Sequence, residues 1–348
     1  MDEGKLDIEL LHEILIKKGS KNEGVIKSGE VGLDVATLDI SAAQRKAQEF
    51  YNTTSETYLI VKSDPVTFPT SEPGRYAVIV NANDIVCSGA LPYGFLATII
   101  VPPKTKFEEI KEIQNQIHQQ CYDLGISLLG GHTEISKSVR NIIISGHMIG
   151  FVPEDFYVTN ELSEDESIII VGEIGAEGIG ILISEADEHI HNILEPSELE
   201  KGILIGKRLS LGDIANIINK KFHPSLIHDA TEGGLYGALS EILFDRDVGI
   251  QLFEEPSISP ILKKLSESLN FDPFRIISSG LIIFSVTKNK TNDFLNFLKD
   301  HQIPGSLIGS VTSEKGILRL DNNILEKPKS DEIIIALENL ERLKNENA

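Results

Sequence analysis

The distribution of apolar residues predicts helices and strands in the first half of the chain. The clearest helix lies within residues 105–125, where apolar side chains recur every three or four positions and Gly125 ends the pattern. A shorter helix is predicted within residues 6–18 on the same grounds. Residues 73–89 contain the strand-like stretch YAVIV, but over their full length the apolar residues share one helical face, so we predict a helix. The other face carries Asn81, Asp84 and Ser88.

Stretches rich in branched apolar residues predict strands before and after these helices. In the first half of the chain they are VATLDI, TYLIVKSD, YGFLATIIV, ISLLGG and NIIISGHMIGFV. Alternation of strands and helices is typical of a layered α/β or α+β domain. The sequence therefore predicts a mixed α/β fold.

An acidic, turn-rich segment separates two such patterns. Residues 153–165 read PEDFYVTNELSED, and a new apolar pattern begins with SIIIVGEIG soon afterwards. We therefore predict an N-terminal domain over residues 1–155, a C-terminal domain over residues 160–330 and a C-terminal helix or tail over residues 331–348. In the second domain we predict helices at 199–207, 213–220 and 292–298 and strands at 249–253 and 280–286.

The charge and the cysteine content narrow the class of protein. A formal net charge of -21 argues against binding to nucleic acid or to an anionic membrane surface. No apolar run reaches the roughly 18 residues that a membrane span needs, and the acidic N-terminal stretch lacks the basic-then-apolar order of a signal peptide. The two cysteines, Cys87 and Cys121, suit a reducing compartment. We therefore expect a cytoplasmic protein that binds neither nucleic acid nor membrane.

Residues 225–243, SLIHDATEGGLYGALSEIL, combine charged residues, two glycines and an apolar helix pattern. Asp229 and Glu232 have the spacing of a capping box, although Asp replaces the usual Ser or Thr. Gly233 and Gly234 leave backbone amides bare at the positive end of the predicted helix, where a phosphate could approach. Asp229 could instead hold a metal that carries the phosphate. A plain N-cap whose glycines ease close packing is a further alternative.

Three aspartates of the N-terminal half, Asp34, Asp64 and Asp84, lie where a strand or helix meets a loop. If they converge, they could bind Mg²⁺ ions shared with phosphates, because Mg²⁺ prefers hard oxygen ligands and keeps several waters. Each of them alone could equally be a helix cap or a solvated charge.

The segment LLGGHTEIS places two glycines, Gly130 and Gly131, directly after an apolar strand. Glycine at such a position allows a ligand to approach the backbone closely. His132, Thr133 and Glu134 then offer an imidazole, a hydroxyl and a carboxylate. By itself the segment is a weak motif.

Together and in this order, these segments resemble the aminoimidazole ribonucleotide (AIR) synthetase superfamily. That group includes the AIR synthetases, the selenophosphate synthetases, the thiamine-monophosphate kinases and the hydrogenase-maturation proteins that dehydrate a carbamoyl group. Within it the chain most resembles the hydrogenase expression/formation branch, which has an Asp-Pro-Thr-Arg-Gly-Gly element where this chain has DATEGG. The matching segments, from about residue 32 to residue 286, are GLDVATLDI, VKSDPVTF, VNANDIVCSGALP, LLGGHTEIS, VGEIGAEGIGILISE, IHDATEGGLYGALSEI and ISSGLIIFSV.

The resemblance implies a two-domain AIR synthetase-like fold. Strands of the N-terminal, ATP-binding domains would pair across a homodimer to close a β-barrel, and a C-terminal α/β domain would follow. The implied cofactors are ATP and Mg²⁺, and the implied metal ligands are Asp34, Asp64 and Asp84. We predict nucleotide contacts from Asn81, Gly130, Gly131, Thr133, Gly233 and Gly234, and catalytic roles for Asp84, His132 and Asp229, with Asp229 facing the nucleotide from the second domain.

The chain departs from the family pattern at several positions. Leu33 precedes Asp34 where the family often has a second acid, and Glu232 replaces a cation of the hydrogenase branch. His132 stands where the common Gly-Gly-Asp-Thr has its aspartate, and we consider it a candidate general acid or base because an imidazole titrates near neutral pH. The hydrogenase-maturation enzyme carries its substrate on a terminal cysteine, but no cysteine follows Cys121 here, so we do not expect that particular reaction.

The sequence therefore predicts an ATP-dependent enzyme that phosphorylates an oxygen, of amide type or similar, in a small molecule or a carrier-bound group. Its chemistry would be related to hydrogenase maturation or to AIR synthetase. Phosphoryl transfer depends on positioning and on charge neutralisation by Mg²⁺, which explains why aspartates dominate the motifs. The alternative is a paralogue that binds nucleotide without turnover and acts as an assembly or regulatory partner in metal-cofactor maturation. A second copy of the chain and a maturation protein are the expected partners.

Overall fold

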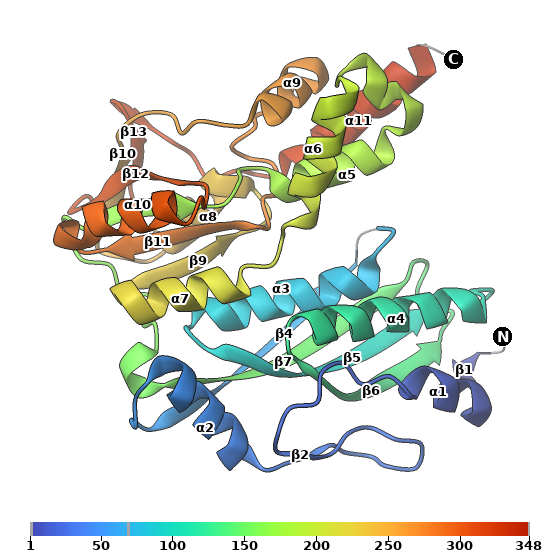
Figure 1. The fold of residues 1–348 in the computed structure, drawn as a ribbon. Helices are drawn as coiled ribbons and strands as arrows, with labels where there is room; N and C mark the ends of the chain where they lie inside the picture. The colour runs from blue at the N-terminus through green and yellow to red at the C-terminus, as the bar shows by residue number, and fades with distance from the viewer. Residues whose placement is uncertain (1–2, 68–69, 347–348) are drawn as a thin grey trace. The chain divides into compact units, whose positions relative to one another are not determined.

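The computed structural model describes residues 3–67 and 70–346, except for the side chains of residues 187, 188 and 346. The chain divides into two compact units. Unit 1 contains Met1–Tyr157 together with Gly212–Lys220, and unit 2 contains Val158–Leu211 together with Lys221–Ala348. Each unit is built round its own β-sheet (Figure 1).

Unit 1 contains a five-stranded sheet in the order β1-β6-β5-β7-β4. β5 and β6 run parallel, and every other neighbouring pair runs antiparallel. The strands are β1 Gly4–Lys5, β4 Thr57–Val66, β5 Leu91–Val101, β6 Ser127–Ile135 and β7 Ile143–Pro153. A separate two-stranded sheet pairs β2 Val25–Lys27 with β3 Thr37–Leu38. The sheet therefore ends in β4, a long edge strand.

Helices α3 and α4 lie side by side along one face of this sheet (Figure 1). Eleven of the residues of α3 are buried, because the helix packs both on the sheet and on α4. The helices predicted within residues 6–18, 73–89 and 105–125 are confirmed. The helices of unit 1 are α1 Ile8–Leu15, α2 Ile40–Tyr51, α3 Pro73–Cys87 and α4 Phe107–Asp123, together with most of α7 Gly212–Phe222.

The strand predicted over VATLDI is confirmed only at Thr37–Leu38 and is wrong elsewhere. Only β3 is extended there, and helix α2 begins at Ile40. Asp39 caps this helix, because its Oδ1 accepts a hydrogen bond from the Ser41 N–H at 3.0 Å. The buried face of the helix consists of Ala42, Ala43, Ala47 and Tyr51. The capping aspartate and the small-residue face therefore override the strand propensity of the segment.

Unit 2 contains a seven-stranded mixed sheet in the order β14-β13-β10-β12-β8-β11-β9. Its strands are β8 Ser167–Val171, β9 Leu226–Ala230, β10 Gly249–Leu252, β11 Leu281–Val286, β12 Gly305–Thr312, β13 Leu318–Leu320 and β14 Asn323–Ile324. Its helices are α5 Ala176–Glu185, α6 Pro196–Lys207, α8 Gly234–Ile242, α9 Pro260–Leu269, α10 Thr291–Asp300 and α11 Glu332–Glu346. Short 3-10 helices lie at Glu154–Phe156, Asp187–Asn192 and Lys288–Lys290.

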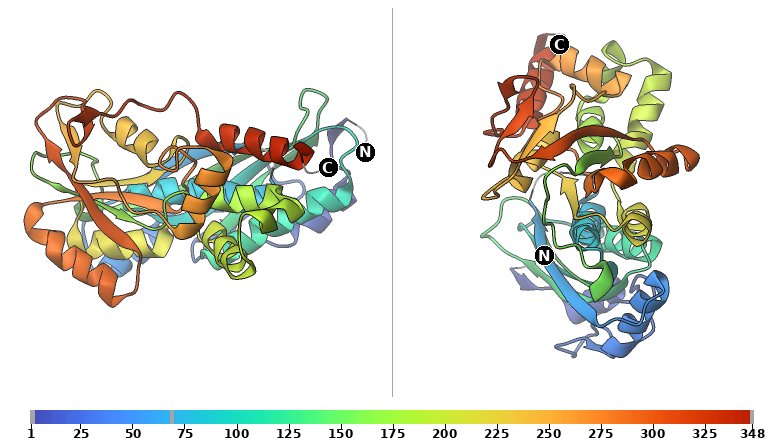
Figure 2. Two further views of the ribbon diagram at one scale, coloured as in Figure 1. Left: turned by 90° about the horizontal axis from the view of Figure 1, so that it is seen from above. Right: turned by 90° about the vertical axis from the view of Figure 1, so that its left-hand side faces the viewer.

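The core of unit 2 forms round the inner strands β8 and β11, which are buried at every position. Helix α11 packs against α5 and α9 (Figure 2). The helices predicted at 199–207, 213–220 and 292–298 and the strands predicted at 249–253 and 280–286 are confirmed, but residues 213–220 lie in unit 1 and not in the second domain. Helix α9 and strand β12 were not predicted. Helix α9 had a readable signal, since Ser259 caps it and Pro260 occupies its first turn.

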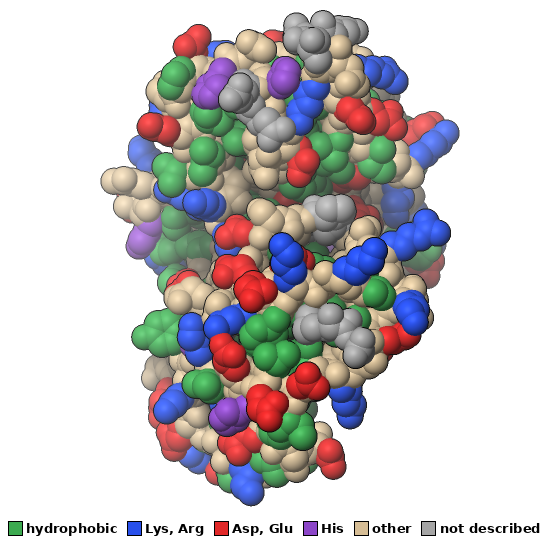
Figure 3. Space-filling model, turned by 90° about the vertical axis from the view of Figure 1, so that its right-hand side faces the viewer, with side chains coloured by type: hydrophobic (Ala, Val, Ile, Leu, Met, Phe, Trp, Pro, Cys, Tyr) green, Lys and Arg blue, Asp and Glu red, His purple; other side chains and the backbone are tan. Residues whose placement is uncertain are grey.

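The chain thus has the predicted two-domain mixed α/β fold. Neither large sheet closes on itself within the described residues, so a barrel would require strands from another chain. None of the helices in residues 3–67 and 70–346 has the length and apolar character that crossing a membrane requires. On the face drawn in Figure 3, acidic and basic side chains are interspersed.

Candidate functional site

Two of the predicted metal ligands meet at a lysine in unit 1. Strand alternation places Lys62 and Asp64 of β4 on the same face of the sheet, the face along which α3 carries Asp84. The Lys62 Nζ atom lies 2.7 Å from Asp84 Oδ2 and 3.7 Å from Asp64 Oδ2. We call these three residues the Lys62 cluster. Its two carboxylates surround one positive charge, and all three side chains are partly exposed to water.

Asn81 fixes α3 against the strand that carries Asp64. Asn81 is fully buried, and its Nδ2 donates hydrogen bonds to the carbonyls of Asp64 at 3.1 Å and Ala77 at 2.9 Å. Its Oδ1 is buried and has no hydrogen-bond partner among the described residues. Gly146 pairs with Asp64 from β7, and a Cβ there would lie 2.3 Å from Asn81 Nδ2, so glycine makes room for the amide. Asn81 and Asp84 are neighbours on one face of α3, so the same contact also places Asp84.

A row of paired residues crosses the sheet from the Lys62 cluster to β6. Asp64 pairs with Gly146, Gly146 with Ala97, and Ala97 with Gly131. At about 4.8 Å per strand, this row spans roughly 14 Å. A Cβ on Gly131 would lie 1.9 Å from the Ala97 carbonyl oxygen, so the row needs glycine at that point. A predicted metal ligand and a predicted nucleotide-binding glycine therefore share one level of the sheet.

Gly130 allows the loop of residues 29–34 to lie directly on β6. The Gly29 N–H donates to the Leu129 carbonyl at 2.5 Å, and a Cβ on Gly29 would lie 2.8 Å from the Gly130 Cα. The glycine pair thus serves the contact of two backbones. The sequence could not distinguish this packing role from the approach of a ligand.

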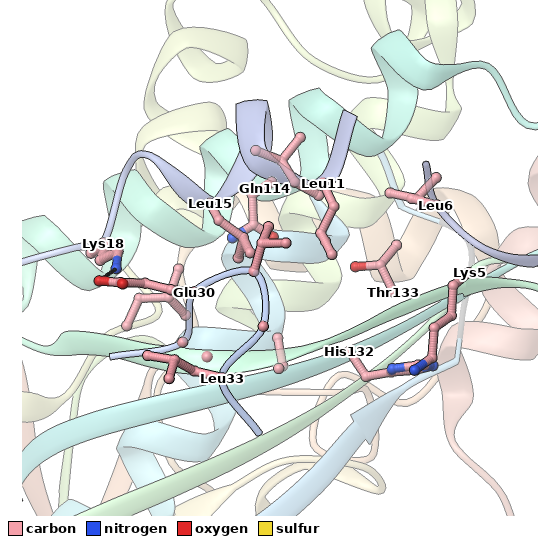
Figure 4. A pocket seen from close by; sticks show the side chains of 18 of the residues that line it. Lys5, Leu6, Leu11, Leu15, Lys18, Glu30, Leu33, Gln114, His132 and Thr133 are labelled. Carbon is pink, nitrogen blue, oxygen red and sulfur yellow. Dashed lines mark hydrogen bonds and ion pairs between the residues drawn. The ribbon is translucent and has the colours of Figure 1, made fainter. Parts of the chain in front are cut away.

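A cavity of about 300 Å³ lies between this loop, α1 and β6 (Figure 4). Three lysines, Lys5, Lys17 and Lys18, bring positive charge to its wall, beside the apolar side chains of α1. Figure 4 shows Thr133 and His132 on the β6 side of this cavity. Five predicted site residues line it, namely Asp34, Gly130, Gly131, His132 and Thr133.

His132 has a carboxylate partner two residues further along β6. Its Nε2 lies 2.9 Å from Glu134 Oε2, and both side chains are about two-fifths exposed. Residues i and i+2 of a strand point to the same face, so Glu134 can hold the imidazole in one orientation.

The predicted residues of unit 1 therefore fall into two sets. Asp64, Asp84 and Asn81 belong to the Lys62 cluster and its support, whereas Asp34 lies in the wall of the cavity with His132. Among the residues that the structure describes, no three His, Cys, Asp or Glu side chains are grouped so that they could hold a metal ion. A fully formed three-carboxylate site is thus not present in this arrangement.

In unit 2, Asp229 is a buried residue of β9 that pairs with Ile282 of β11. The predicted capping box of Asp229 and Glu232 is wrong, because α8 begins at Gly234 and its N-cap is Gly233, with φ of 76°. Pairing with β11 keeps Asp229 in the sheet, and the chain turns between the strand and the helix. The left-handed conformation of Gly233 explains why glycine is needed there.

Asp331, which the sequence analysis did not single out, binds the start of α8. Its carboxylate accepts hydrogen bonds from the N–H groups of Gly233 at 2.6 Å, Ile277 at 3.1 Å and Ile333 at 2.8 Å. The Gly234 N–H donates to the Thr231 carbonyl at 3.1 Å. Partial burial raises the Asp331 pKa above its ordinary value, and the three N–H groups oppose this.

We call Asp331 and its three N–H donors the Asp331 cluster. Its partners at Gly233 and Ile277 lie 98 and 54 residues away in the sequence. The position of Asp331 directly before an apolar helix was a readable cap signal, but its distant partners were not readable.

A second buried acid of unit 2 is Glu177, in the first turn of α5. It is 1% exposed, and its Oε2 has no hydrogen-bond partner among the described residues. Burial raises its pKa to about 7; hydrogen bonds from Ser279 lower it, and the charges of Asp331 and Glu232 raise it further. Glu177 therefore titrates close to neutral pH.

Two family models match the chain. One is described as AIR synthase related protein, N-terminal domain, and matches residues 46–152. The other is described as AIR synthase related protein, C-terminal domain, and matches residues 163–321. Together they cover most of the chain.

Curated relatives match the chain over most of its length. A protein of Methanocaldococcus jannaschii, provisionally named a hydrogenase expression/formation protein, is 27% identical over 338 residues, which are 95% of this chain and 96% of that one. Carbamoyl dehydratase HypE of Escherichia coli is 24% identical over 290 residues, or 82% of each chain. Thiamine-monophosphate kinase of Bacillus subtilis is 26% identical and matches over 73% of this chain and 79% of that one.

Solved structures have the same fold. HypE of E. coli, a hydrogenase maturation protein, has a TM-score of 0.72 and 20% identity, covering 93% of this chain and 98% of that one. A HypE in complex with ATP has a TM-score of 0.68 and 18% identity, covering 87% and 90%. A chain of a HypE–HypF complex has a TM-score of 0.60 and 20% identity, covering 78% of this chain and 90% of that one.

Proposed function

The chain belongs to the AIR synthase related proteins, and from this premise we propose that it binds ATP in unit 1 and transfers a phosphoryl group to an oxygen atom of an acceptor. The acceptor oxygen is of amide type or similar and belongs to a small molecule or to a group held on a carrier. The observation that carries the proposal is the Lys62 cluster, in which Asp64 and Asp84 already gather round a positive charge.

The relatives support an ATP-dependent reaction. One is named a carbamoyl dehydratase, another a thiamine-monophosphate kinase, and one solved HypE contains ATP. These names differ in their acceptors but agree with a shared phosphoryl-transfer step. The fold that this chain shares with them therefore favours ATP as the donor, with the acceptor as the part that varies.

The residues of the Lys62 cluster fit a divalent metal ion. Mg²⁺ prefers hard oxygen ligands and keeps several waters, so two carboxylates suffice to anchor it beside a nucleotide. The buried Asn81 Oδ1 adds an acceptor that has no partner among the described residues. We propose Asp64 and Asp84 as the metal ligands and Asp34 as a further ligand of metal or phosphate from the cavity wall. When bound, Mg²⁺ would neutralise charge on the phosphates.

In the proposed step, a lone pair of the acceptor oxygen forms a bond to the γ-phosphorus of ATP. The bond from that phosphorus to the bridging oxygen breaks, and ADP leaves with its electron pair. If the acceptor is a hydroxyl or an amide, its proton must also leave. We propose His132 as the base that takes this proton, with Glu134 2.9 Å from its Nε2 to orient the ring and stabilise the imidazolium.

We propose that part of the nucleotide binds in the cavity beside β6. Gly130, Gly131 and Thr133 line it, and Lys5 and Lys17 supply positive charge for an anionic ligand, while Lys18 is paired with Glu30 at 3.2 Å. Its volume of about 300 Å³ lies at the lower end of the range for small-molecule sites. We propose that loop 29–34 closes over part of the nucleotide here.

The acceptor is proposed not to be a thiol of this sequence. Cys87 and Cys121 are both buried, and burial raises the pKa of the Cys121 thiol well above its ordinary value. A buried protonated thiol is a poor nucleophile and a poor carrier. An oxygen acceptor from outside the chain is therefore the simpler proposal.

Asp229 of unit 2 stays a proposed catalytic residue, as the resemblance to the family implies. The nucleotide contacts of Gly233 and Gly234 stay predictions. Both of their N–H groups already donate within the unit, to Asp331 and to Thr231. A phosphate would have to replace those acceptors.

We propose that two copies of the chain pair through β4. This strand is ten residues long and forms the edge of its sheet, and it exposes Leu59 and Val61 at 54% and 68%. Long edge strands with exposed apolar residues need a cover, and a second β4 would extend both sheets towards a closed barrel. Replacing Leu59 by Lys should yield a monomer in analytical ultracentrifugation, and an unchanged dimer would contradict this interface.

A second candidate function is nucleotide binding without turnover, in an assembly role in metal-cofactor maturation. The observation that favours it is Lys62, which already neutralises the carboxylates that a metal would need. The solved HypE–HypF complex supports a maturation protein as a partner in either case.

The deciding experiment measures Mg²⁺-dependent ATP hydrolysis and nucleotide affinity on the wild type and on Asp84→Asn. Asp247→Asn is the matched control, because Asp247 forms an exposed ion pair with Lys315 at 2.6 Å in unit 2. We expect Asp84→Asn to lose about 100-fold in turnover, on the scale of losing one transition-state contact, and Asp247→Asn to lose none. Tight binding without turnover in the wild type would favour the second candidate. Absence of nucleotide binding would contradict both.

A further inference from the structure

The positive charge between Asp64 and Asp84 belongs to the chain itself. The Lys62 Nζ is within hydrogen-bond distance of Asp84 and more loosely placed beside Asp64. An ammonium at this point does electrostatically what a metal ion would do, because it relieves the repulsion of two neighbouring carboxylates. Because side chains alternate along β4, Lys62 lies on the same face of the strand as Asp64 and therefore close to the carboxylates.

Lys62 is held in a way that permits exchange. Its side chain is 36% exposed, and its 3.7 Å separation from Asp64 is too long for a hydrogen bond. Ion pairs in contact with water contribute little, because solvent competes for both partners. A lysine ammonium is also a compact charge on a flexible four-carbon stem. A divalent cation that prefers carboxylate oxygens could therefore take its place.

Asn81, which holds α3 against β4 below the Lys62 cluster, is firmly packed, unlike the partly exposed lysine. Asn81 is fully buried and ties α3 to the backbone of Asp64, so the two carboxylates keep their spacing whether or not Lys62 is present. The buried Oδ1 of Asn81 has no partner among the described residues, and the observed ammonium contacts do not explain it. The orphan acceptor thus lies on the side chain that holds α3 against the backbone of Asp64.

We infer that Lys62 is an internal counter-ion of Asp64 and Asp84. A divalent metal displaces the lysine from the two carboxylates, and the Lys62 ammonium then pairs with a phosphate oxygen of the nucleotide. The inference rests on the proposed function, because it requires a nucleotide in unit 1. It explains how an acidic cluster comes to accept a polyanion. Two carboxylates and one ammonium leave the cluster with one net negative charge, and a divalent ion changes that to one net positive charge. Metal therefore binds first or together with the nucleotide.

The first test is a titration of the full chain with Mn²⁺ in the absence of nucleotide. The electron paramagnetic resonance signal of free Mn²⁺ measures how much of the metal is bound. Lys62→Met should bind Mn²⁺ about tenfold more tightly than the wild type, because the internal competitor is gone. Lys315→Met is the matched control, since Lys315 also lies beside an aspartate, Asp247, at 2.6 Å, and it should leave the affinity unchanged. Equal or weaker Mn²⁺ binding by Lys62→Met would overturn the inference.

The second test measures the affinity for a non-hydrolysable ATP analogue at saturating Mn²⁺. Lys62→Met should bind the analogue about tenfold more weakly, and Lys62→Arg should recover most of the affinity because it restores the positive charge. Opposite changes for metal and nucleotide in one variant cannot come from partial unfolding, which weakens both. An unchanged nucleotide affinity would overturn the pairing with phosphate.

The two tests also separate this inference from the proposed function. If the wild type binds no nucleotide, the proposed function fails, and the pairing of Lys62 with phosphate is overturned with it. The nucleotide-free Mn²⁺ titration still decides whether Lys62 competes with metal. If the wild type binds and hydrolyses ATP while Lys62→Met shows no gain in Mn²⁺ affinity, the proposed function stands and the inference fails.

Discussion

In both the Lys62 cluster of unit 1 and the Asp331 cluster of unit 2, a charged side chain of the protein itself occupies a predicted ligand site. The charge is positive in unit 1 and negative in unit 2. In unit 1 the carboxylates of Asp64 and Asp84 hold an ammonium, and in unit 2 the amide at the start of α8 holds a carboxylate. The contacts differ in kind. Lys62 faces two partly exposed side chains, whereas Asp331 accepts three hydrogen bonds from the backbone of three separate segments.

This difference indicates at which site a ligand can replace the internal contact. A side chain that pairs with side chains at the surface can leave without disturbing the backbone, so the Lys62 cluster suits exchange with a ligand. A carboxylate that joins three backbone segments supports the fold, so its removal should destabilise unit 2. The site in unit 1 is therefore the better candidate for a metal, although both sites drew attention through the same kind of motif.

The largest expected effect is a loss of stability in Asp331→Ala. Three N–H groups lose their acceptor, which should lower the free energy of unfolding of unit 2 by about 3 to 4 kcal/mol, at about 1.0 to 1.3 kcal/mol each. Lys62→Met should cost less than about 1 kcal/mol, because partly exposed ion pairs contribute little. Urea unfolding of both variants tests the comparison directly. Asp331→Asn, which keeps one acceptor oxygen, should fall between them, and equal losses for Asp331→Ala and Lys62→Met would refute it.

The next effect is a pH dependence that Glu177 imposes on unit 2. Its pKa is about 7 in the folded protein against an ordinary value of 4.5, so the folded state binds more protons between these values. The wild type should therefore lose stability as pH rises from about 4.5 through 7, by about 3 kcal/mol in all. Glu177→Gln, which mimics the neutral acid, should match the wild type near pH 4.5 and exceed it at pH 8.5.

Thermal or urea unfolding at several pH values measures this difference. A constant gap between Glu177→Gln and the wild type across that range would show that Glu177 does not titrate in the window.

The smallest of the three effects concerns the support of the Lys62 cluster. Gly146→Ala places a methyl group 2.3 Å from Asn81 Nδ2 and 2.8 Å from the Phe95 ring, which should destabilise unit 1 by about 2 kcal/mol. A double-mutant cycle with Asn81→Ala checks the cause. If Asn81 is the obstacle, the loss at Gly146 should shrink in the Asn81→Ala background. Full additivity would show that the methyl group is obstructed by the Phe95 ring and not by Asn81.

Much of the local structure could be predicted from the sequence, because it depends on the spacing of nearby residues. The periodic apolar faces of α3 and α4 and the branched runs of β4 and β5 identify those elements without reference to the rest of the chain. Where prediction failed, a local cap or a distant strand pairing decided the structure. Asp39 capped a helix inside a supposed strand, and β9 took up Asp229 by pairing with β11.

The composition of the candidate site was also partly predictable. Motifs in the sequence singled out Asp64, Asp84 and Asn81, and the structure brings these three together. The same motifs singled out Asp34, which lies in the wall of the cavity with His132. Spacing along the chain did not show that Asp64 and Asp84 would lie in the Lys62 cluster and Asp34 in the wall of the cavity.

By itself, the sequence determined most of the helices and strands of the first half, the two-domain α/β class and the family, because local periodicity and short motifs carry that information. Only the tertiary structure decided which charges neutralise each other. Lys62 and Asp84 come from different elements, and Asp331 lies 98 residues from Gly233. The energy of a charge depends on what surrounds it in space, and residues that far apart become neighbours only when the sheets and helices pack.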